Sequence, residues 1–384
     1  MHQPKGFINS QYPSNVCKLN KALYGLKQAP RAWYDRLKNS ILQWSFQALK
    51  SDTSLFFQHS ERDIIMVLIY VDDILVTSSN TVLIENVIKQ LGSEFALEDL
   101  GDFSYFLGLE VTPSVEGFHL SQTKYICDIL SKANMLGSKS CTTPISVSEK
   151  LQKDLCSPFE NTSLKRSIIG SLQYVTLTRP GMAFAVSKLS QFLAAHIVLH
   201  WQACKRLLRY LQGTTYFGLQ FHHSGSLILT TYLDADWGSD PDDRRPIGGY
   251  CVFLGSNLVS WSSKKQTLVS RSTAESEYRA LASATSEVLW ITYLLKELKA
   301  QLDTSPVLYC DNKSAEPLVS NLKYHTRTKH IELDIHFIRE HVAKKELTIQ
   351  HVSSSDQLAD IFTKPLSLDH FGYMRSKLNV SPRP

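Results

Sequence analysis

One stretch, residues 64–77, constrains the fold more than any other, because it places two adjacent carboxylates between two apolar runs. The runs are rich in β-branched residues, and Asp72 and Asp73 stand between them. This pattern predicts a β-hairpin with strands buried on most sides and the aspartates at its tip. Since like charges that lose hydration repel one another, the pair requires a cation. A divalent metal bound through oxygen, as in phosphoryl chemistry, suits this position better than an ordinary Asp-Asp turn.

Composition narrows the class of protein. The 384 residues allow two or three domains, and 43% hydrophobic with 20% charged residues is typical of globular proteins. No apolar run is long enough to predict a membrane span. The seven cysteines are odd in number and form no Cys-x-x-Cys pair, which indicates a reducing, intracellular location in cytoplasm or nucleus. The net charge of +5 is a mild excess that allows a polyanionic partner.

The N-terminal region is basic and aromatic. Residues 1–34 contain no acidic side chain, and Gly25 and Pro30 interrupt the segment before a predicted helix that runs to about Gln43. Lysines beside tyrosine and tryptophan suit a surface that pairs phosphates and stacks bases. Taken alone, the segment fits slightly better as a helix whose aromatic side chains lie in a core.

Several motifs in the first half of the chain occur in a fixed order. They are LYGLKQAPRAWY at 23–34, YVDD at 70–73, DLG at 99–101, YFLGLEV at 105–111, GSLQY at 170–174 and TRP at 178–180. Together they resemble the reverse transcriptase of copia-type LTR retrotransposons, and the resemblance extends over essentially the whole chain. It implies a palm in which Asp72 and Asp73 bind catalytic metals. It also implies that Lys27, Gln28 and Arg31 contact a primer–template.

In one respect the sequence departs from the pattern of this family. A reverse transcriptase palm implies three carboxylates, the first from a strand upstream of residues 25–34, and here nothing acidic precedes Asp35. Residues 1–7 resemble the family's sequence just beyond that strand, so we expect Met1 to be internal to a longer reading frame. We therefore expect no polymerase activity from the chain as given, and a full polymerase only if the natural chain extends upstream.

Downstream of the hairpin the pattern turns largely helical. The sequence predicts a helix at 81–91 that ends at a turn around Gly92, and then a β-hairpin with Gly117 in its loop. Amphipathic helical periodicity follows over residues 121–213. By the resemblance, residues 115–225 are the thumb and connection region.

From residue 226 the pattern changes to strands. The predicted strands are 227–233, 248–254, 258–262, 307–310 and 347–352, and the predicted helices are 272–299, 313–320, 330–344 and 356–362. This order is that of a ribonuclease H-like fold, a mixed sheet covered by helices. We therefore predict an α/β (α+β) chain. Its three domains are a truncated palm at 1–114, a mostly helical thumb/connection region at 115–225 and a ribonuclease H-like domain at 226–372.

Four carboxylates lie where that fold would gather them. They are Asp234, Glu277, Asp311 and Asp360, each at the end of a predicted strand or on a predicted helix. Strand ends at one edge of a sheet, with facing helices, can bring such side chains together. A cluster of this kind would hold two Mg²⁺ (or Mn²⁺) ions about 4 Å apart. Any one of the four alone would more often be a surface carboxylate, so the set carries the inference.

The ribonuclease H motifs of copia-type elements coincide with these positions. They are DADW at 234–237, TAESEY at 273–278, CDNKSA at 310–315 and DQLADIFTKPL at 356–366. The resemblance implies that the four carboxylates are the metal ligands. Residues two apart share a face on a strand, so strand geometry leaves Asp236 open as an alternative to Asp234. On a helix only one of Glu275 and Glu277 can face the sheet, and the apolar spacing that follows favours Glu277.

Basic residues in the same region are candidates for nucleic-acid contacts. Lys264, Lys265, Arg327 and Lys329 could pair with the phosphates of a hybrid, leaving specificity to duplex shape and 2′-hydroxyl groups. His351, in the strand before Asp360, is a candidate for assisting proton transfer.

Two functions remain in competition. The first is a retrotransposon Pol fragment whose ribonuclease H domain cleaves the RNA strand of RNA–DNA hybrids. The second is a non-catalytic, nucleic-acid-binding relic. Both imply RNA–DNA hybrid and primer–template partners and no membrane, and the sequence does not indicate an oligomeric state.

Overall fold

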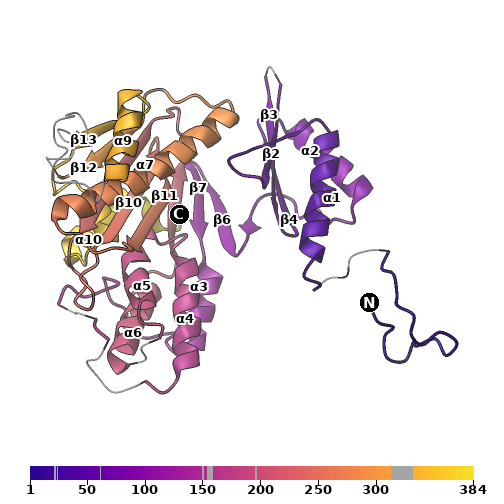
Figure 1. Ribbon diagram of the computed structural model, residues 1–384, viewed down its shortest axis with the longest axis horizontal. Coiled ribbons are helices and arrows are strands. Elements are labelled where there is room, and N and C mark those ends of the chain that lie inside the picture. The colour runs from indigo at the N-terminus through magenta and orange to yellow at the C-terminus, as the bar shows by residue number, and fades with distance from the viewer. Residues whose placement is uncertain are drawn as a thin grey trace. The chain divides into compact units, whose positions relative to one another are not determined.

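The computed structural model describes residues 1–20, 23, 25–60, 62–148, 151–153, 159–194, 197–312 and 332–384 (Figure 1). The chain folds as two compact units, Met1–Gly101 and Asp102–Pro384. Within the described ranges, no helix has both the length and the apolar character needed to cross a bilayer. The predicted domain boundaries at 114/115 and 225/226 remain predictions.

The first unit contains a four-stranded antiparallel sheet in the order β1-β2-β3-β4 and two helices. The strands are β1 (Gln47–Ala48), β2 (Leu55–His59), β3 (Ile64–Tyr70) and β4 (Asp73–Ser78), and the helices are α1 (Ala29–Gln43) and α2 (Thr81–Glu94). Alternate residues of β3 are buried, and they pack with Leu37 and Ile41 of α1 and Leu91 of α2. The helices therefore cover one face of the sheet.

Two expectations for this unit are corrected. The hairpin at residues 64–77 forms, but its strands are not buried on most sides, because one layer of helices covers only one face and β4 is half-buried. Gly92 does not end the helix. The amide of Phe95 still donates to the carbonyl oxygen of Leu91, so α2 continues through Gly92 to Glu94.

One of the two sheets of the second unit is a five-stranded antiparallel sheet in the order β14-β8-β7-β6-β5. Its strands are β5 (Tyr105–Phe106), β6 (Leu109–Ser114), β7 (Gly117–Ser121), β8 (Phe217–His222) and β14 (Val380–Pro382). The predicted hairpin around Gly117 is present. A side chain at Gly117 would place a Cβ 2.2 Å from the carbonyl oxygen of Phe221, so only glycine fits this approach of β7 to β8.

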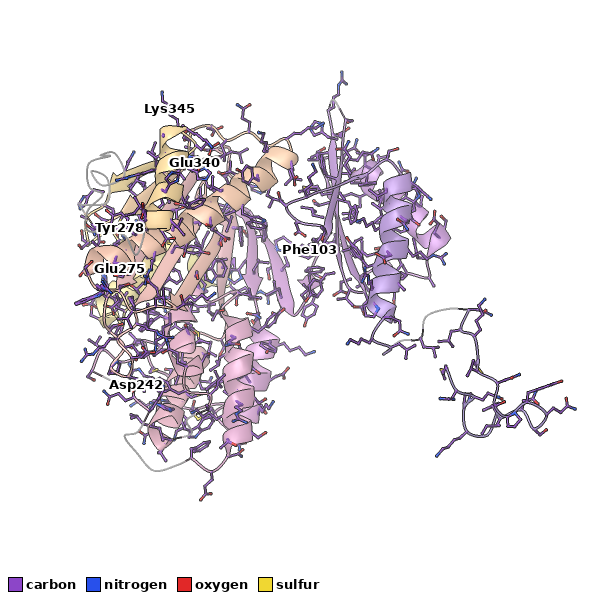
Figure 2. The ribbon with its side chains drawn as sticks, in the orientation of Figure 1. Phe103, Asp242, Glu275, Tyr278, Glu340 and Lys345 are labelled. Atoms are coloured by element: carbon purple, nitrogen blue, oxygen red, sulfur yellow. The ribbon has the colours of Figure 1, made fainter. Side chains whose placement is uncertain are left out.

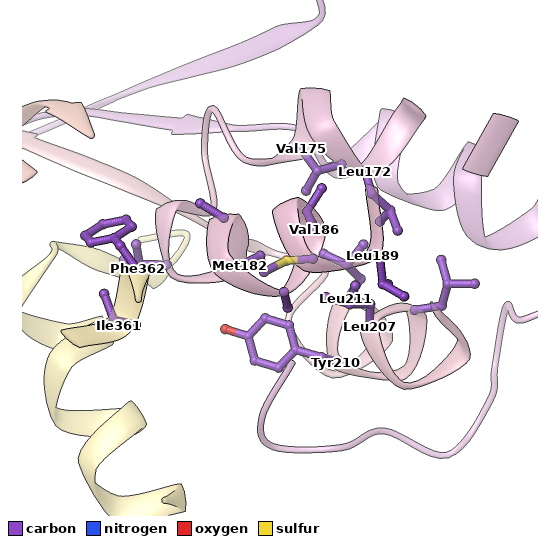
Figure 3. Packing of buried hydrophobic residues seen from close by; sticks show 14 of the residues in the cluster. Leu172, Val175, Met182, Val186, Leu189, Leu207, Tyr210, Leu211, Ile361 and Phe362 are labelled. Carbon is purple, nitrogen blue, oxygen red and sulfur yellow. The ribbon is translucent and has the colours of Figure 1, made fainter. Parts of the chain in front are cut away.

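Helices of the same unit build its larger core (Figure 3). They are α3 (Thr123–Lys132), α4 (Thr162–Val175), η1 (Pro180–Met182), α5 (Ala183–Ser190) and α6 (Val198–Gly213). Figure 3 shows Ile361 and Phe362 from near the C-terminus beside Met182. These residues belong to one buried cluster, so the core of the helical region also holds a C-terminal segment in place.

The second sheet of this unit is mixed, with the order β11-β10-β9-β12-β13. Its strands are β9 (Leu229–Asp236), β10 (Ile247–Leu254), β11 (Asn257–Lys265), β12 (Val307–Cys310) and β13 (Thr348–His351). The first three are antiparallel, whereas β12 runs parallel to β9 and β13 runs parallel to β12. This is the predicted ribonuclease H-like mixed sheet, and the α/β fold class is confirmed.

Helical segments pack on both faces of this sheet. They are α7 (Thr273–Glu297), α9 (Glu332–Ala343), the 3-10 helix η3 (Leu358–Phe362) and α10 (Leu368–Lys377). A Cβ at Gly248 would meet Ala280 of α7, whereas a Cβ at its neighbour Gly249 would meet Phe362 of η3. Because successive residues of a strand point to opposite faces, α7 and η3 lie on opposite faces of β10. The predicted helix at 313–320 lies outside the described residues.

Candidate active site

The parallel pairing of β9 and β12 brings two of the predicted carboxylates to one edge of the sheet. Asp234 lies near the carboxyl end of β9, and Asp311 directly follows β12. Tyr309 of β12 is in register with Tyr232 of β9, so both strands reach the same edge before their acidic residues. Carboxyl ends of neighbouring parallel strands are a recurrent place for binding sites in α/β proteins.

The helix α7 contributes the third carboxylate. The Ser272 hydroxyl accepts a hydrogen bond from the Glu275 amide at 3.2 Å, so Ser272 is the N-cap of α7. This start places Glu277 at the sheet edge, where its Oε2 accepts a hydrogen bond from the Cys310 thiol with a 3.7 Å separation. One ligand atom each from Glu277, Cys310 and Asp311 lie within 4.8 Å of one another.

The fourth carboxylate, Asp360, is supplied by η3. Two hydrogen bonds fix this segment to the sheet. The Gln357 side-chain amide donates to the Leu233 carbonyl oxygen at 2.8 Å, and the Ser263 hydroxyl donates to the Phe362 carbonyl oxygen at 2.6 Å. The close approach requires Gly249, because a Cβ there would lie 2.6 Å from Phe362 Cβ. Gly249 is the register partner of Asp234, so it sets how close η3 comes to that carboxylate.

Two residues just after Asp360 complete the site. The Thr363 hydroxyl donates to Asp234 Oδ2. The Lys364 Nζ lies 2.9 Å from Asp360 Oδ1 and 3.7 Å from Asp234 Oδ2. Sequence reasoning did not assign a role to Thr363, Lys364 or Gly249. A signal for the first two was available in the motif DIFTKPL, which places them within one helical turn of Asp360.

The electrostatics of the cluster show that its negative charges are incompletely compensated. Burial, followed by the charges of Asp234 and Asp311, raises the pKa of Glu277 to about 9. Burial and the Asp234 charge raise the pKa of Asp360 to about 7, although Lys364 acts in the opposite direction. Burial and Asp234 also raise the pKa of Asp311. Desolvation and mutual repulsion both disfavour the ionised forms, so the cluster favours an additional cation.

The chemistry of the donors fits a hard divalent metal. Four carboxylate groups supply oxygen ligands of the kind that Mg²⁺ and Mn²⁺ prefer. Asp234, Glu277 and Asp360 are only 4%, 6% and 5% exposed, so protein atoms replace most of the water that would otherwise hydrate them. We infer that Asp234, Glu277, Asp311 and Asp360 are the residues that would hold the metal.

The two alternatives left open by the sequence have different surroundings. Glu275, labelled with Tyr278 in Figure 2, forms an ion pair with Arg279 at 2.7 Å and accepts the Arg271 amide at 2.7 Å. Its charge is therefore compensated away from the cluster. Asp236 is half-buried, and burial is the main reason that its pKa is raised. Asp234, by contrast, raises the pKa values of the other three carboxylates and contacts Thr363.

The hairpin carboxylates of the first unit have a different environment. Asp72 and Asp73 are both exposed. Val71 takes a positive φ of 55° in the turn, and its carbonyl oxygen accepts a hydrogen bond from Trp33 Nε1 at 2.8 Å. In the part of the chain that the structure describes, no group of three acidic, histidine or cysteine ligands within 4.8 Å includes Asp72 or Asp73.

The predicted nucleic-acid contacts differ in accessibility. Lys27, Gln28, Arg31 and Lys264 are exposed, whereas Arg327 and Lys329 lie outside the described residues. Lys265 is mostly buried, and its Nζ lies 2.7 Å from Asp240 Oδ2 and 2.8 Å from Asp243 Oδ1. These partners occupy its charge, so its surroundings do not support the predicted phosphate contact. His351 is exposed at the end of β13, in register with Cys310.

Comparisons with known proteins agree with the copia-type motifs found in the sequence. A family described as "Reverse transcriptase (RNA-dependent DNA polymerase)" matches residues 1–147. The chain is 46% identical over 384 residues to the retrovirus-related Pol polyprotein from transposon RE1 of Arabidopsis thaliana, covering 100% of this chain and 26% of that protein. It is 32% identical over 289 residues to the putative transposon Ty5-1 protein of Saccharomyces cerevisiae, covering 74% of this chain and 94% of that protein.

The chain thus spans 26% of the length of the RE1 polyprotein. Among solved structures, a foamy viral protease-reverse transcriptase in complex with RNA/DNA hybrid is 14% identical, with a TM-score of 0.49, and the match covers 90% of this chain and 40% of that chain.

Proposed function

Because the chain belongs to the copia-type retrotransposon Pol family, with reverse transcriptase and ribonuclease H ancestry, we propose that its second unit hydrolyses the RNA strand of RNA–DNA hybrids by two-metal catalysis. One observation carries the proposal. Four carboxylates that are far apart in the sequence, on β9, on α7, after β12 and on η3, converge at one sheet edge and interact electrostatically. Three of the four, Asp234, Glu277 and Asp360, are buried, unlike the carboxylates of an ordinary surface cluster.

Different residues of the second unit have different roles in the proposed reaction. Asp234, Glu277, Asp311 and Asp360 would hold two Mg²⁺ or Mn²⁺ ions, which supply activation of the attacking water and stabilisation of the leaving oxygen. Thr363 orients Asp234 through its hydroxyl donor. Lys364 supplies a fixed positive charge beside Asp360 and limits the rise in the pKa of that carboxyl group. Cys310 donates to Glu277 and so restricts the orientation of the carboxylate.

The hairpin supports a narrower statement. Metal binding by Asp72 and Asp73 at the hairpin tip remains a proposal, and we predict no polymerase activity for the chain as given. The exposed residues Lys27, Gln28 and Arg31 are proposed contacts for a primer–template.

The test is cleavage of an end-labelled RNA–DNA hybrid by the purified full chain with Mg²⁺. Asp311→Asn should lower the rate by more than about 100-fold, since even residues that support a metal ligand typically contribute 10- to 100-fold. Asp72→Asn is the matched control, because it removes an acidic charge of the same size from the other carboxylate site, and it should leave the rate unchanged. Duplex DNA and single-stranded RNA of the same sequence should resist cleavage.

Two results would count against the proposal. Hybrid binding without cleavage by the wild-type chain would favour a non-catalytic relic. Cleavage that survives in Asp311→Asn would point to a contaminating nuclease or to a site elsewhere.

A further inference from the structure

A cavity of the second unit is lined by residues 142–148, by α6 and by the start of α10. Its volume is about 400 Å³, within the range of roughly 300–1,000 Å³ that is usual for small-molecule sites. Half of the described lining residues carry hydroxyl groups, namely Thr142, Thr143, Ser146, Ser148 and Ser367. Four more are apolar, namely Ile145, Val147, Leu366 and Leu368. Arg206 of α6 is the one charged side chain among them, and we call this cavity the arginine pocket.

Arg206 enters the pocket with part of its hydrogen-bonding capacity unused. Its Nη2 donates to the Thr143 hydroxyl at 2.7 Å, which holds the guanidinium against residues 142–148. Its Nε is buried and makes no hydrogen bond to the described residues. In that part of the chain, no carboxylate oxygen lies within 4.0 Å of the guanidinium nitrogens. A half-buried guanidinium without an acidic partner favours an anionic ligand.

The residue just before the pocket reports a positive potential on this side of α6. The Cys141 thiol donates to the Arg206 carbonyl oxygen at 3.2 Å, and the Cys141 amide donates to the Arg209 carbonyl oxygen at 3.3 Å. Burial raises the pKa of Cys141, whereas the charges of Arg206 and Arg209 act in the opposite direction. Both guanidinium groups therefore stabilise negative charge next to the segment that lines the pocket.

The start of α10 adds backbone donors to the same pocket. Ser367 is the N-cap residue of α10, and its side chain makes no capping hydrogen bond. The amides of the first turn of a helix have no partner within the helix, and they attract anions. Since Ser367 and Leu368 both line the pocket, the first of these amides lies at its wall. The helix start thus supports the anion preference that Arg206 establishes.

The apolar part of the lining narrows the class of ligand. Leu366 belongs to the buried cluster of the helical region, and Ile145 packs against that cluster, so both side chains are fixed. An inorganic anion on Arg206 would leave these side chains without a partner. A ligand that carries an organic group beside its anionic group would cover them and fill more of the cavity.

We propose that the arginine pocket binds a small phosphate monoester of the size of a nucleoside monophosphate. The phosphate accepts hydrogen bonds from Arg206 and from the hydroxyl groups of the lining, and the organic group packs against Ile145 and Leu366. Arginine suits this role because its planar guanidinium donates parallel hydrogen bonds to phosphate oxygens. None of the four clustered carboxylates is among the described lining residues, so this inference goes beyond the proposed nuclease and does not depend on it.

The test is calorimetric titration of the purified full chain with AMP, with inorganic phosphate and with adenosine, in HEPES buffer with EDTA. Without a divalent metal, the carboxylate cluster repels the phosphate and does not contribute to binding. AMP should bind roughly tenfold more tightly than inorganic phosphate, because contact with a small apolar area is enough for a tenfold change. Adenosine should bind at least about tenfold more weakly than AMP, because it lacks the group that Arg206 recognises.

Two variants locate the binding site. Arg206→Gln should weaken AMP binding about 10- to 100-fold, the usual contribution of a hydrogen bond to a charged group. Ser148→Glu changes an exposed residue and places a negative charge in the lining, so it should also weaken AMP binding while the chain stays folded. Arg166→Gln is the matched control, because it removes the same charge from an exposed arginine of α4 outside the pocket lining. It should leave the Kd unchanged.

Several outcomes would overturn the proposal. They are absence of AMP binding by the folded wild-type chain, equal Kd values for AMP and adenosine, and equal Kd values for AMP and inorganic phosphate. AMP affinity that survives both Arg206→Gln and Ser148→Glu would place the ligand elsewhere. If Arg206→Gln does not fold, Ser148→Glu alone decides. Hybrid cleavage enters none of these measurements, so failure of the pocket and failure of the nuclease are distinguishable.

Discussion

The two acidic sites of this chain are built from the same residue types but in opposite environments. Asp72 and Asp73 stand exposed in and beside a two-residue turn of an antiparallel hairpin, where water reaches both carboxylates. In the second unit, Asp234, Glu277 and Asp360 are almost fully buried, and each comes from a different element. Adjacent acidic residues in a sequence are thus a poorer indicator of electrostatic strain than separated ones that the fold brings together.

The difference has a physical origin. An exposed pair at a turn keeps its hydration, so repulsion between the two charges is weakened by the solvent. A buried cluster loses hydration and screening together, which is why burial is the leading cause of each raised pKa among Glu277, Asp311 and Asp360. The second unit therefore holds electrostatic free energy that a divalent cation can release, whereas the exposed hairpin offers much less.

The largest expected effect is on the pH dependence of stability in the absence of divalent metal. An acid with a raised pKa in the folded state binds more protons when folded than when unfolded, so the free energy of unfolding falls as pH rises. Because the pKa of Glu277 is raised to about 9, the decrease between pH 5 and 8 should be about 1.4 kcal/mol per pH unit from this group alone. Glu277→Gln, which cannot ionise, should flatten the profile and stabilise the protein at pH 8.

Urea denaturation in EDTA at each pH provides the measurement. The difference between wild type and Glu277→Gln isolates this carboxyl group from the other groups that titrate in the same range. Asp73→Asn is the control from the exposed site, and it should leave the shape of the profile unchanged. If the unfolding free energies of wild type and Glu277→Gln change with pH in parallel, the proposed difference between the buried and the exposed carboxylates is wrong.

The sequence could predict which elements carry the buried carboxylates, but not every contact among them. Strand and helix periodicity placed Asp234, Glu277 and Asp311 near element ends. Asp234 and Asp236 could not be separated, because residues two apart on a strand share a face. Their partners separate them, since Thr363 and Lys364 reach Asp234 from a segment more than a hundred residues away. No local pattern reports such a contact.

The sequence did not predict strands β8 and β14, and the reason resembles that for the two corrections in the first unit. The number of layers covering a sheet decides how many faces are buried, and residues 64–77 alone do not specify it. Likewise, β8 and β14 pair through residues such as Leu219 and Val380, which are far apart in sequence. The ion-pair partners of Lys265, Asp240 and Asp243, likewise lie in the loop after β9, some twenty residues away in sequence, so the positive charge of Lys265 alone does not indicate what it contacts.

A second prediction tests whether the close approach of η3 is what makes the buried site. Gly249→Ala would place a Cβ 2.6 Å from Phe362 Cβ and 3.0 Å from Thr363 Cγ2, so η3 must shift. The expected loss is about 1–3 kcal/mol of unfolding free energy, as for other overpacked positions. The shift would also move Asp360 away from Asp234, so the affinity for Mg²⁺, measured by calorimetric titration, should fall.

The neighbouring glycine supplies the matched control. A Cβ at Gly248 would lie 3.5 Å from Gln266 Nε2 and 3.6 Å from Ala280 Cβ, which are ordinary contacts. Gly248→Ala should therefore change stability and Mg²⁺ affinity little. Equal effects of the two substitutions would mean that loss of glycine flexibility in β10, and not the approach of η3, determines the result.

The smallest expected effect concerns the exposed site. The double substitution Asp72→Asn with Asp73→Asn should change the free energy of unfolding by no more than about 0.5 kcal/mol, because substitutions of exposed side chains without ionic partners usually have small effects. Within the described residues, neither aspartate has an ion-pair partner within 4.0 Å. Urea denaturation at pH 7 with and without Mg²⁺ checks this. Two outcomes would show that the hairpin binds a cation despite its exposure. One is a loss of unfolding free energy above about 1 kcal/mol, and the other is a Mg²⁺-dependent stabilisation that disappears in the double variant. The two carboxylate sites would then differ only in degree.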